Sequence, residues 1–326
     1  MKILVTGSSG HLGEALVRTL SERGFDVLGL DIRKSAFTSV VGSVDDSETV
    51  AECMQGVEVV YHAATLHKPH VATHSMQEFI DTNVSGTLVL LQAAKACGVK
   101  AFVFTSTTSM FGDALRPLAG TPAAWVTEDV RPIPKNIYGV TKTAAEDLCL
   151  LFHRKHGLNC IILRTSRFFP EEDDDKLKRD NYDEKNAKAN EYLFRRVELE
   201  DVVSAHIAAA ERAPKLGFGR YIISATTPFQ QEDLLELNSD AQAVVRRRVP
   251  EYIDVYERLG WVMFDRIDRV YINDAAREDL GWRPKYDFSH ILACLKTSGY
   301  PSSPISQQVG SKGYHDKVFE EGPYPV

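Results

Sequence analysis

Short apolar runs alternate with longer amphipathic segments along the first half of the chain. We predict strands at the five runs that are apolar without alternating polar positions: KILVTG, DVLGLD, VEVVYHAA, AFVFTST and NCIILRT. Between them, residues 12–23, 75–97 and 136–156 carry apolar residues at helical spacing. Because strands that are apolar on both faces need cover on both faces, the pattern predicts a doubly wound parallel α/β sheet with helices on either side.

The pattern changes after Pro170. Residues 171–192 read EEDDDKLKRDNYDEKNAKANEY and contain hardly any aliphatic side chains, so we expect an exposed insertion or a mobile flap. Helical spacing returns in VELEDVVSAHIAAAERA, GRYIISA is a further predicted strand, and helical patterns continue through residue 248 and near residues 288–296. Residues 299–326 are rich in Pro, Gly and Ser, and we expect an extended tail that is an arm on a partner subunit or disordered.

These changes of pattern predict two interleaved domains. The first is a doubly wound, Rossmann-type domain made of residues 1–165 and 198–226. The second is a smaller C-terminal substrate-binding domain made of residues 166–197 and 227–298, with the extended tail 299–326 after it.

Composition narrows the class of partner. The chain has 326 residues, of which 44% are hydrophobic and 25% charged, and a net charge of -7, so nothing favours nucleic acid or an anionic membrane. A small-molecule substrate is the expected partner. Five cysteines without a CxxC pair give no zinc or redox motif. The N-terminal apolar run is too short for a signal peptide and no run could span a membrane, so we expect a cytoplasmic protein.

A glycine-rich turn, TGSSGHLG, follows the first predicted strand and opens the first predicted helix. Gly7, Gly10 and Gly13 permit a tight turn whose backbone N–H groups can approach a pyrophosphate, as in dinucleotide sites. Asp31 ends the second predicted strand, where a carboxylate can accept hydrogen bonds from both ribose hydroxyls and would repel a 2′-phosphate. NAD is therefore favoured over NADP, although Arg33 and Lys34 could pair with a phosphate.

Further motifs extend this pattern: YHAAT at 61–65, TNVSGT at 82–87, FTSTTSMFG at 104–112 and YGVTK at 138–142. With them the chain resembles the extended short-chain dehydrogenase/reductase family, the NAD-dependent epimerase/dehydratase group, over about residues 1–170 and more loosely to about 297. The resemblance implies that Tyr138 is the acid/base, that Lys142 lowers its pKa and binds the nicotinamide ribose, and that Thr107 is the catalytic hydroxyl. A lysine and a positive nicotinamide ring both favour phenolate, so the phenol could titrate near neutral pH.

The resemblance also implies a cofactor site and an assembly. The residues expected at the cofactor are Gly7, Ser9, Gly10, His11, Leu12, Gly13, Asp31, Ile32, Arg33, Ser43, Val44, Ala63, Ala64, Thr65, Asn83, Thr105, Tyr138, Lys142 and Phe168. Asn83 would lie near the ribose, or would act as a helix-capping or interhelical amide. The helices at 75–97 and 136–156 would form the four-helix seam of a homodimer.

The substrate end departs from the resembled enzymes. Thr108 and Ser109 replace the Asp and Glu that follow the catalytic Thr in 4,6-dehydratases, which argues against dehydration. Arg167 replaces an Asn of related epimerases and could clamp a carboxylate or phosphate, or form an ion pair with Glu171 or Glu172.

Three histidines lie just past the fourth predicted strand. His67 and Lys68 are candidate substrate contacts, because ligands bind at the carboxyl ends of parallel strands. Zinc at His67, His70 and His74 is conceivable, but no Cys or carboxylate has ligand spacing, so pocket histidines and no metal are expected.

The sequence therefore predicts an NAD-dependent oxidoreductase or epimerase that exchanges a hydride between nicotinamide C4 and a secondary alcohol carbon of a sugar-like or nucleotide-sugar substrate. A simple dehydrogenase or reductase of a small hydroxylated, acidic metabolite is the alternative. A non-catalytic protein that senses NAD(P) by binding it is the remaining alternative.

Overall fold

A seven-stranded sheet forms the centre of the computed structural model, which describes residues 1–118, 120–297, 299, 302–313 and 319. Its strand order is β3-β2-β1-β4-β5-β7-β8, and every neighbouring pair is parallel. The strands are β1 (Lys2–Thr6), β2 (Asp26–Asp31), β3 (Val40–Val41), β4 (Val57–His62), β5 (Ala101–Thr107), β7 (Cys160–Thr165) and β8 (Phe218–Ile223). The order reverses between β1 and β4, which is the crevice where such sheets bind ligands.

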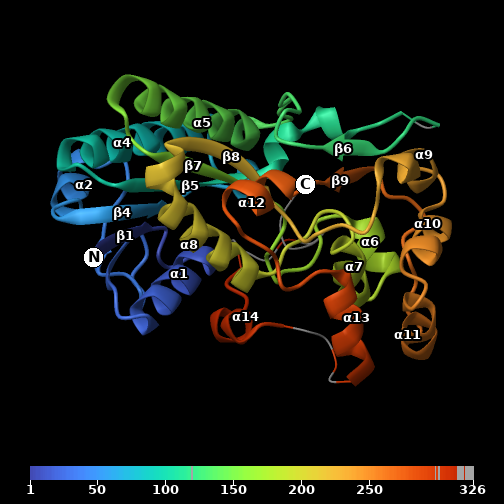
Figure 1. The fold of residues 1–326 in the computed structure, drawn as a ribbon. Helices are drawn as coiled ribbons and strands as arrows, with labels where there is room; N and C mark the ends of the chain where they lie inside the picture. Colours follow the sequence, from blue (N-terminus) through green and yellow to red (C-terminus); the bar gives the residue numbers. More distant parts are fainter. Residues whose placement is uncertain (119, 298, 300–301, 314–318, 320–326) are drawn as a thin grey trace.

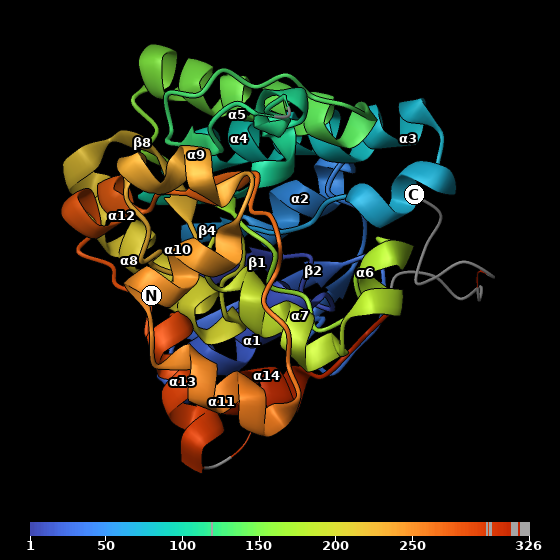
Figure 2. The same cartoon turned by 90° about the vertical axis from the view of Figure 1, so that its right-hand side faces the viewer.

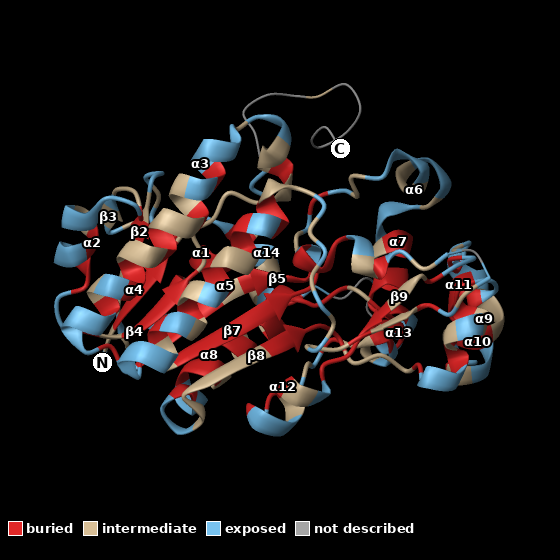
Figure 3. Cartoon of the chain, turned by 90° about the horizontal axis from the view of Figure 1, so that it is seen from above, coloured by how far each residue is buried: buried red, intermediate tan, exposed pale blue. Residues whose placement is uncertain are grey.

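Helices cover both faces of the sheet (Figure 1). On one face lie α1 (His11–Glu22) and α8 (Leu199–Leu216), and on the other α2 (Ser47–Cys53), α4 (Gly86–Cys97) and α5 (Ile137–His156). Along β1, Ile3 and Val5 pack towards α1 and α8 while Leu4 packs towards the opposite helices. The central strands β1, β4, β5 and β7 are accordingly almost entirely buried (Figure 3), and the predicted fold class is confirmed.

A second group of elements lies beyond the carboxyl ends of the strands and is seen in front of the sheet in Figure 2. It has its own hydrophobic core, to which Leu193, Val244, Tyr256 and Ile291 contribute. Its helices are α6 (Lys176–Asn181), α7 (Glu184–Glu191), α9 (Leu234–Leu237), α10 (Ala241–Arg248), α11 (Tyr252–Leu259) and α13 (Phe288–Thr297). A small parallel sheet joins β6 (Ala124–Val126) to β9 (Arg269–Tyr271). The exact domain boundaries remain a prediction.

The remaining elements are short. They comprise α3 (Met76–Ile80), α12 (Asp274–Asp279), α14 (Pro304–Val309), the single turns η1 (Lys68–Ala72), η3 (Thr108–Phe111), η4 (Asp113–Leu115) and η5 (Gln231–Asp233), and a π-helical turn η2 (Asp81–Ser85). The predicted helix over residues 75–97 therefore contains a π turn between α3 and α4, which turns Asn83 into the interior. Within the described residues, no helix combines the length and the apolar character that crossing a membrane requires.

The prediction of an exposed insertion at 171–192 is wrong for its second half. Residues 186–187 and 189–191 are buried, and Ala187 and Ala189 join the second core. Polar side chains tolerate this burial because they have partners: Asn190 donates to the carbonyl of Val262 (2.9 Å) and accepts from the hydroxyl of Tyr256 (2.7 Å). The aliphatic content of a segment does not reveal such partners, which come from distant parts of the chain.

The prediction of an extended tail is wrong for residues 304–309, which form α14 against α1 and α8. Ser303 caps this helix by accepting a hydrogen bond from the backbone of Ser306 (3.1 Å), and Pro304 follows at its first position. Val309 is buried in the same core as α1. Residues 300–301, 314–318 and 320–326 of the predicted tail lie outside the described residues.

Candidate active site

A cleft of about 910 Å³ runs along the carboxyl ends of the central strands. All but two of the predicted site residues line it, namely Gly7, Ser9, Gly10, His11, Leu12, Gly13, Asp31, Ile32, Arg33, Ser43, Val44, Ala63, Ala64, Thr65, His67, Lys68, Thr105, Thr107, Thr108, Ser109, Tyr138, Arg167 and Phe168. The exceptions are Asn83 and Lys142, which are buried next to the cleft wall.

The glycine loop leaves no room for side chains. Gly7 has a φ of +72°, and a Cβ there would lie 2.7 Å from the backbone nitrogen of Ala64. A Cβ on Gly13 would lie 1.9 Å from the carbonyl oxygen of Gly7. The loop is therefore packed against the end of β4 and the first turn of α1, with its backbone along the cleft. This arrangement fits the pyrophosphate of a dinucleotide.

Asp31 fixes the other end of the predicted cofactor site. Its carboxylate accepts hydrogen bonds from the backbone nitrogens of Ser9 (2.9 Å) and Arg33 (2.8 Å). Two backbone donors orient the carboxylate at the end of β2, where it lines the cleft beside Ser43 and Val44. The residues present thus fit the adenosine half of NAD, with a carboxylate at the position that receives the ribose hydroxyls.

His11 links this loop to two distant segments. Its Nε2 donates to Glu171 Oε1 (2.8 Å), and the same oxygen accepts from the hydroxyl of Ser311 (2.9 Å) and the backbone nitrogen of Lys312 (3.1 Å). Burial raises the pKa of Glu171, but these hydrogen bonds outweigh it and lower the pKa to about 2. The insertion and the tail therefore meet at the glycine loop, through residues far apart in sequence.

Thr107 and Tyr138 meet where β5 ends and α5 begins. The helix begins after Asn136, whose side chain accepts a hydrogen bond from the backbone of Gly139 (3.2 Å). Burial raises the pKa of the Tyr138 phenol to about 12, and a hydrogen bond from the Thr107 hydroxyl acts in the opposite direction. The two groups that the sequence pairs for acid/base chemistry are thus brought together in the cleft.

Lys142 lies behind this pair, with only 2% of the residue exposed. Its Nζ donates to the carbonyl of Thr105 (2.7 Å) and lies 4.0 Å from the ring centroid of Phe104. Burial lowers the pKa of Lys142 to about 7, although the carboxylate of Glu146 opposes this shift. Among the described residues, the hydrogen bond from Thr107 lowers the pKa of Tyr138, and the predicted effect of Lys142 on this pKa stays a prediction.

Glu146 on α5 is the centre of a buried ion network next to Lys142 and β5, and the sequence did not predict this network. Glu146 is 1% exposed and accepts from the hydroxyl of Ser106 (2.6 Å), from Nη2 of Arg164 (2.8 Å) and from Nε of Arg220 (3.2 Å). The only signal in the sequence is a glutamate one helical turn after the lysine, a spacing that is common on solvent-exposed helix faces as well.

Asn83 has the interhelical role that the sequence left open. Its amide oxygen accepts from the backbone of Leu66 (2.8 Å) and the hydroxyl of Thr65 (2.9 Å), and its nitrogen donates to the carbonyl of Leu66 (2.9 Å) and to Thr141 Oγ1 (3.0 Å). The residue is 2% exposed and does not line the cleft. Asn83 therefore ties the loop after β4 to α5, and so holds two walls of the site in place.

The substrate end of the cleft is rich in cations. Arg167 forms ion pairs with Asp173 (3.4 Å) and Asp174 (3.3 Å), so an ion-pair role that the sequence left open is present with neighbouring carboxylates of the insertion. It contacts Glu172 through the backbone carbonyl (2.7 Å). Lys68 also pairs with Asp174. The lining residues that sequence reasoning missed here include Phe169, Asp174, Arg195, Arg269 and Lys312.

The three histidines lie in sequence along the loop that follows β4. The ring of His67 lies 4.6 Å from that of His70 and stacks on Phe169 at 5.4 Å, and the ring of His70 lies 5.1 Å from that of His74. Among the described residues, no group of three His, Cys, Asp or Glu side chains has an arrangement that could hold a metal ion.

Comparison with known proteins identifies the family. The model of the NAD dependent epimerase/dehydratase family matches residues 3–216, and the chain belongs to this family. A UDP-glucose 4-epimerase of Lactobacillus helveticus is 26% identical over 97% of this chain and 100% of its own length. A 4-hydroxy-2-methyl-3-oxo-4-farnesyl-3,4-dihydroquinoline-1-oxide ketoreductase of Stigmatella aurantiaca is 30% identical over 92% of this chain and 97% of its own length.

Among solved structures, a short-chain dehydrogenase/reductase superfamily protein from Agrobacterium tumefaciens with bound NAD covers 94% of this chain and 98% of its own. It superimposes with a TM-score of 0.64 at 23% sequence identity. The predicted family, the class of NAD-dependent enzyme and the fold are thereby confirmed. Because the two relatives are named for different reactions, the family does not select one reaction for this chain.

Proposed function

We propose that this enzyme exchanges a hydride between nicotinamide C4 and a secondary alcohol carbon of a sugar-like or nucleotide-sugar substrate, with Tyr138 as the acid/base. The observation that carries the proposal is the phenol of Tyr138, hydrogen-bonded to Thr107, in the same cleft as the glycine loop and Asp31. A relative named as a UDP-glucose 4-epimerase supports the substrate class.

The backbone of the glycine loop would hold the pyrophosphate of NAD, and the carboxylate of Asp31 would accept hydrogen bonds from the adenosine ribose. When bound, NAD supplies an acceptor and donor of hydride at nicotinamide C4. Ser43 and Val44 line the cleft beside Asp31 and would contact the adenine.

Positive charge from Lys142 and from a bound nicotinamide ring would favour the phenolate, and as a phenolate Tyr138 would take the proton of the substrate hydroxyl while the hydrogen on the same carbon leaves with its electron pair. The hydroxyl of Thr107 donates to the phenolate and, once Tyr138 is protonated, would donate to the substrate oxygen instead, and Lys142 anchors the end of β5 through the carbonyl of Thr105. The product of this step is a ketone. If the ketone turns over in the cleft before the hydride returns, the product is an epimer; if it leaves, the reaction is a dehydrogenation.

A second candidate is a dehydrogenase or reductase of a small acidic metabolite. The cations Lys68, Arg167, Arg195 and Arg269 in the cleft favour it, and one relative is named as a ketoreductase. A protein that only senses NAD(P) is disfavoured, because sensing needs no hydroxyl placed against a buried phenol. The nucleotide that stays with the purified protein separates the first two candidates, since tightly retained NAD favours an epimerase and an empty site favours a dehydrogenase.

The substitution Tyr138→Phe tests the mechanism. It removes the phenolic oxygen and keeps the ring that packs at the start of α5, so we expect NAD binding within about twofold of wild type and a loss of hydride transfer of at least about 100-fold. NAD binding is measured by calorimetry, and hydride transfer by absorbance at the nicotinamide band with a panel of sugars and nucleotide sugars. Turnover at the wild-type rate would rule out Tyr138 as the acid/base.

We further propose a homodimer through α4 and α5, as the resemblance implies. Val140 and Leu151 on α5 are 50% and 45% exposed, which is high for apolar side chains on a helix that already covers the sheet. Light scattering at micromolar concentration should give twice the mass of one chain, and Leu151→Glu should reduce it to one. A wild-type protein with the mass of one chain would contradict the proposal.

A further inference from the structure

Two neighbouring carboxylates of the insertion lie among the cations of the substrate end. Asp174 lines the main cleft, its side chain is 12% exposed, and it pairs with Lys68 at the start of η1 and with Nη1 of Arg167 at 3.3 Å. Burial raises the pKa of Asp174, but these two cations outweigh it and hold the pKa below its usual value. The contact with Lys68 joins segments 106 residues apart and closes the insertion over the cleft.

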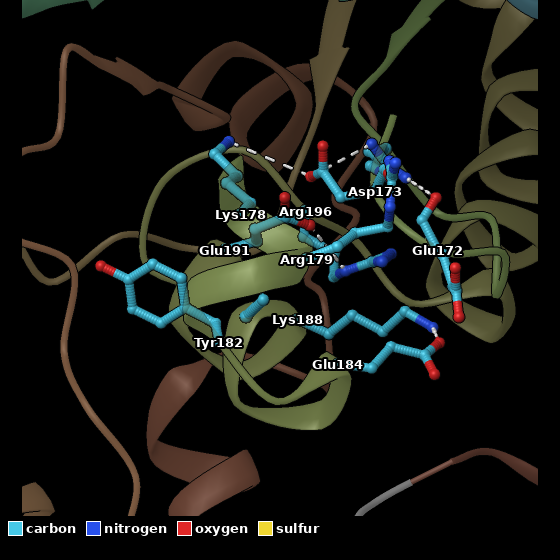
Figure 4. Close-up of a pocket in the computed structure, with 11 residues that line it drawn as sticks. Glu172, Asp173, Lys178, Arg179, Tyr182, Glu184, Lys188, Glu191 and Arg196 are labelled. Carbon is cyan, nitrogen blue, oxygen red and sulfur yellow. Dashed lines mark hydrogen bonds and ion pairs between the residues drawn. The ribbon is translucent and has the colours of Figure 1, made fainter. Parts of the chain in front are cut away.

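Asp173, in contrast to Asp174, does not line the main cleft. It lines an adjoining cavity of about 180 Å³ beneath the insertion, and it contacts Nη2 of Arg195 at 3.1 Å, Nη1 of Arg167 at 3.4 Å and Nζ of Lys178 at 4.0 Å. Figure 4 shows Lys178 directed at the carboxylate of Asp173, with Glu191 and Arg196 beneath them. Asp173 does not line the main cleft, but Arg167 and Arg195 do, so Asp173 pairs with these two cations from the side away from the cleft and ties the insertion to Arg195.

The cleft wall carries more positive than negative side chains at this end. Of the described lining residues, Lys68, Lys135, Arg167, Arg195 and Arg269 are cations here and Asp174 is the carboxylate, whereas Asp31 lies at the glycine-loop end. Nε of Arg195 is buried without a hydrogen-bond partner among the described residues. Cations grouped at a cleft, with one N–H group unused, are suited to an anion with several oxygens.

We propose that Asp174 occupies the position of an anionic group of the substrate, a carboxylate or a phosphate, and that Lys68 and Arg167 bind this group when Asp174 leaves. The inference rests on the proposed function, because it assigns a substrate class to the same cleft. Asp174 is suited to the exchange because it lies at the cleft surface and the next helix, α6, has no buried residue. Asp173 keeps its pairs and holds the base of the insertion while the exchange takes place.

An internal carboxylate competes with an external anion at high effective concentration. Removing the charge of Asp174 should therefore strengthen the binding of an anionic probe, whereas removing either cation should weaken it. If the ion pair were purely structural, removing Asp174 would not strengthen anion binding. Removing either Asp174 or its cations would then only disorder the insertion.

The test is calorimetry on the NAD-loaded protein with D-glucuronate, D-glucose 1-phosphate and neutral D-glucose as probes. We expect Asp174→Asn to bind one or both anions about tenfold more tightly, and Lys68→Gln and Arg167→Gln to bind them at least about tenfold more weakly, with little change for glucose. The anion whose affinity for Asp174→Asn rises above that for the wild type identifies the substrate group as a carboxylate or a phosphate. Asp175→Asn is the matched control, since it makes the same change of charge one residue away at an exposed side chain that does not line the cleft and accepts a hydrogen bond from the backbone of Leu177 (3.0 Å). Its anion affinity should stay within about twofold of wild type.

Equal anion affinities for Asp174→Asn and Asp175→Asn, or no binding of either anion to any variant, would overturn the inference. Thermal unfolding of all variants shows whether each is folded. Equilibrium binding needs no turnover, so its outcome is separate from that of Tyr138→Phe. If Tyr138→Phe remains active and the anion affinities change as expected, only the proposed mechanism is refuted. If Tyr138→Phe is inactive and the anion affinities do not change as expected, only the anion site is refuted.

Discussion

Glu146 offers the sharpest test of how the site is held together. Its carboxylate is 1% exposed and is shared by Ser106, Arg164 and Arg220, beneath the strand that ends in Thr107. Glu146→Gln keeps the size of the side chain and removes its charge. Arg164, itself 4% exposed, then keeps a buried positive charge without its partner.

The size of the effect follows from this burial. Removing one partner of a buried ion pair costs about 3–5 kcal/mol, because the remaining charge stays desolvated. Glu236→Gln is the matched control, since Glu236 and Arg247 also form an ion pair (2.7 Å) but their side chains are 43% and 51% exposed. A surface pair contributes about 0–1 kcal/mol. We therefore expect the two variants to differ by at least about 2 kcal/mol in the free energy of unfolding.

Urea unfolding followed by far-ultraviolet circular dichroism measures the stability difference. The pH profile of kcat/KM gives a second readout: without the charge of Glu146, which raises the pKa of Lys142, the ammonium is lost at lower pH and the alkaline limb moves down. A Glu146→Gln protein no less stable than Glu236→Gln, with an unmoved pH profile, would refute the reasoning.

Two further predictions concern the glycine loop. Gly13→Ala should weaken NAD binding at least about tenfold by calorimetry, because its Cβ would lie 1.9 Å from the carbonyl oxygen of Gly7. Gly56→Ala, at a φ of +73° and with nothing within 4 Å of its Cβ, should cost stability through backbone strain but leave the NAD affinity of the folded protein unchanged. Glu171→Gln should lower the free energy of unfolding by about 2–3 kcal/mol near pH 7, because the pKa of Glu171 is about 2 in the folded chain against an ordinary 4.5. This contribution is complete above pH 4.5 and lost as the pH falls towards 2, so the unfolding curves of variant and wild type should converge in acid, and a constant difference would contradict the assignment.

The sequence was sufficient for features that local pattern decides. Six strands and the helices α1, α4, α5 and α8 follow from runs of apolar residues, and the glycine loop with Asp31 follows from turn chemistry at the first two strand ends. Thr107 and Tyr138 lie together because the end of β5 and the start of α5 face the same edge of the sheet. The strands and the glycine loop follow from residues near one another in the chain, whereas the pairing of Thr107 with Tyr138 was implied by the family resemblance.

Features that depend on distant partners could not be predicted. Asp174 and Lys68 lie in segments whose separation in space no local pattern gives, and the cation cluster they join comes from four parts of the chain. The burial of Asn190 depends on Tyr256 and Val262 in the same way. The two-residue strand β3 and the three-residue strands β6 and β9 were missed because they are too short to show a period.

The hydrogen bonds that join His11, Glu171 and residues 311–312 have a consequence for folding during translation. A ribosome makes His11 about 300 residues before Lys312. The glycine loop therefore emerges without these contacts and can form them only after residues 311–312 have left the exit tunnel. A nascent chain stalled before that point would carry a glycine loop that lacks the hydrogen bonds to residues 311–312.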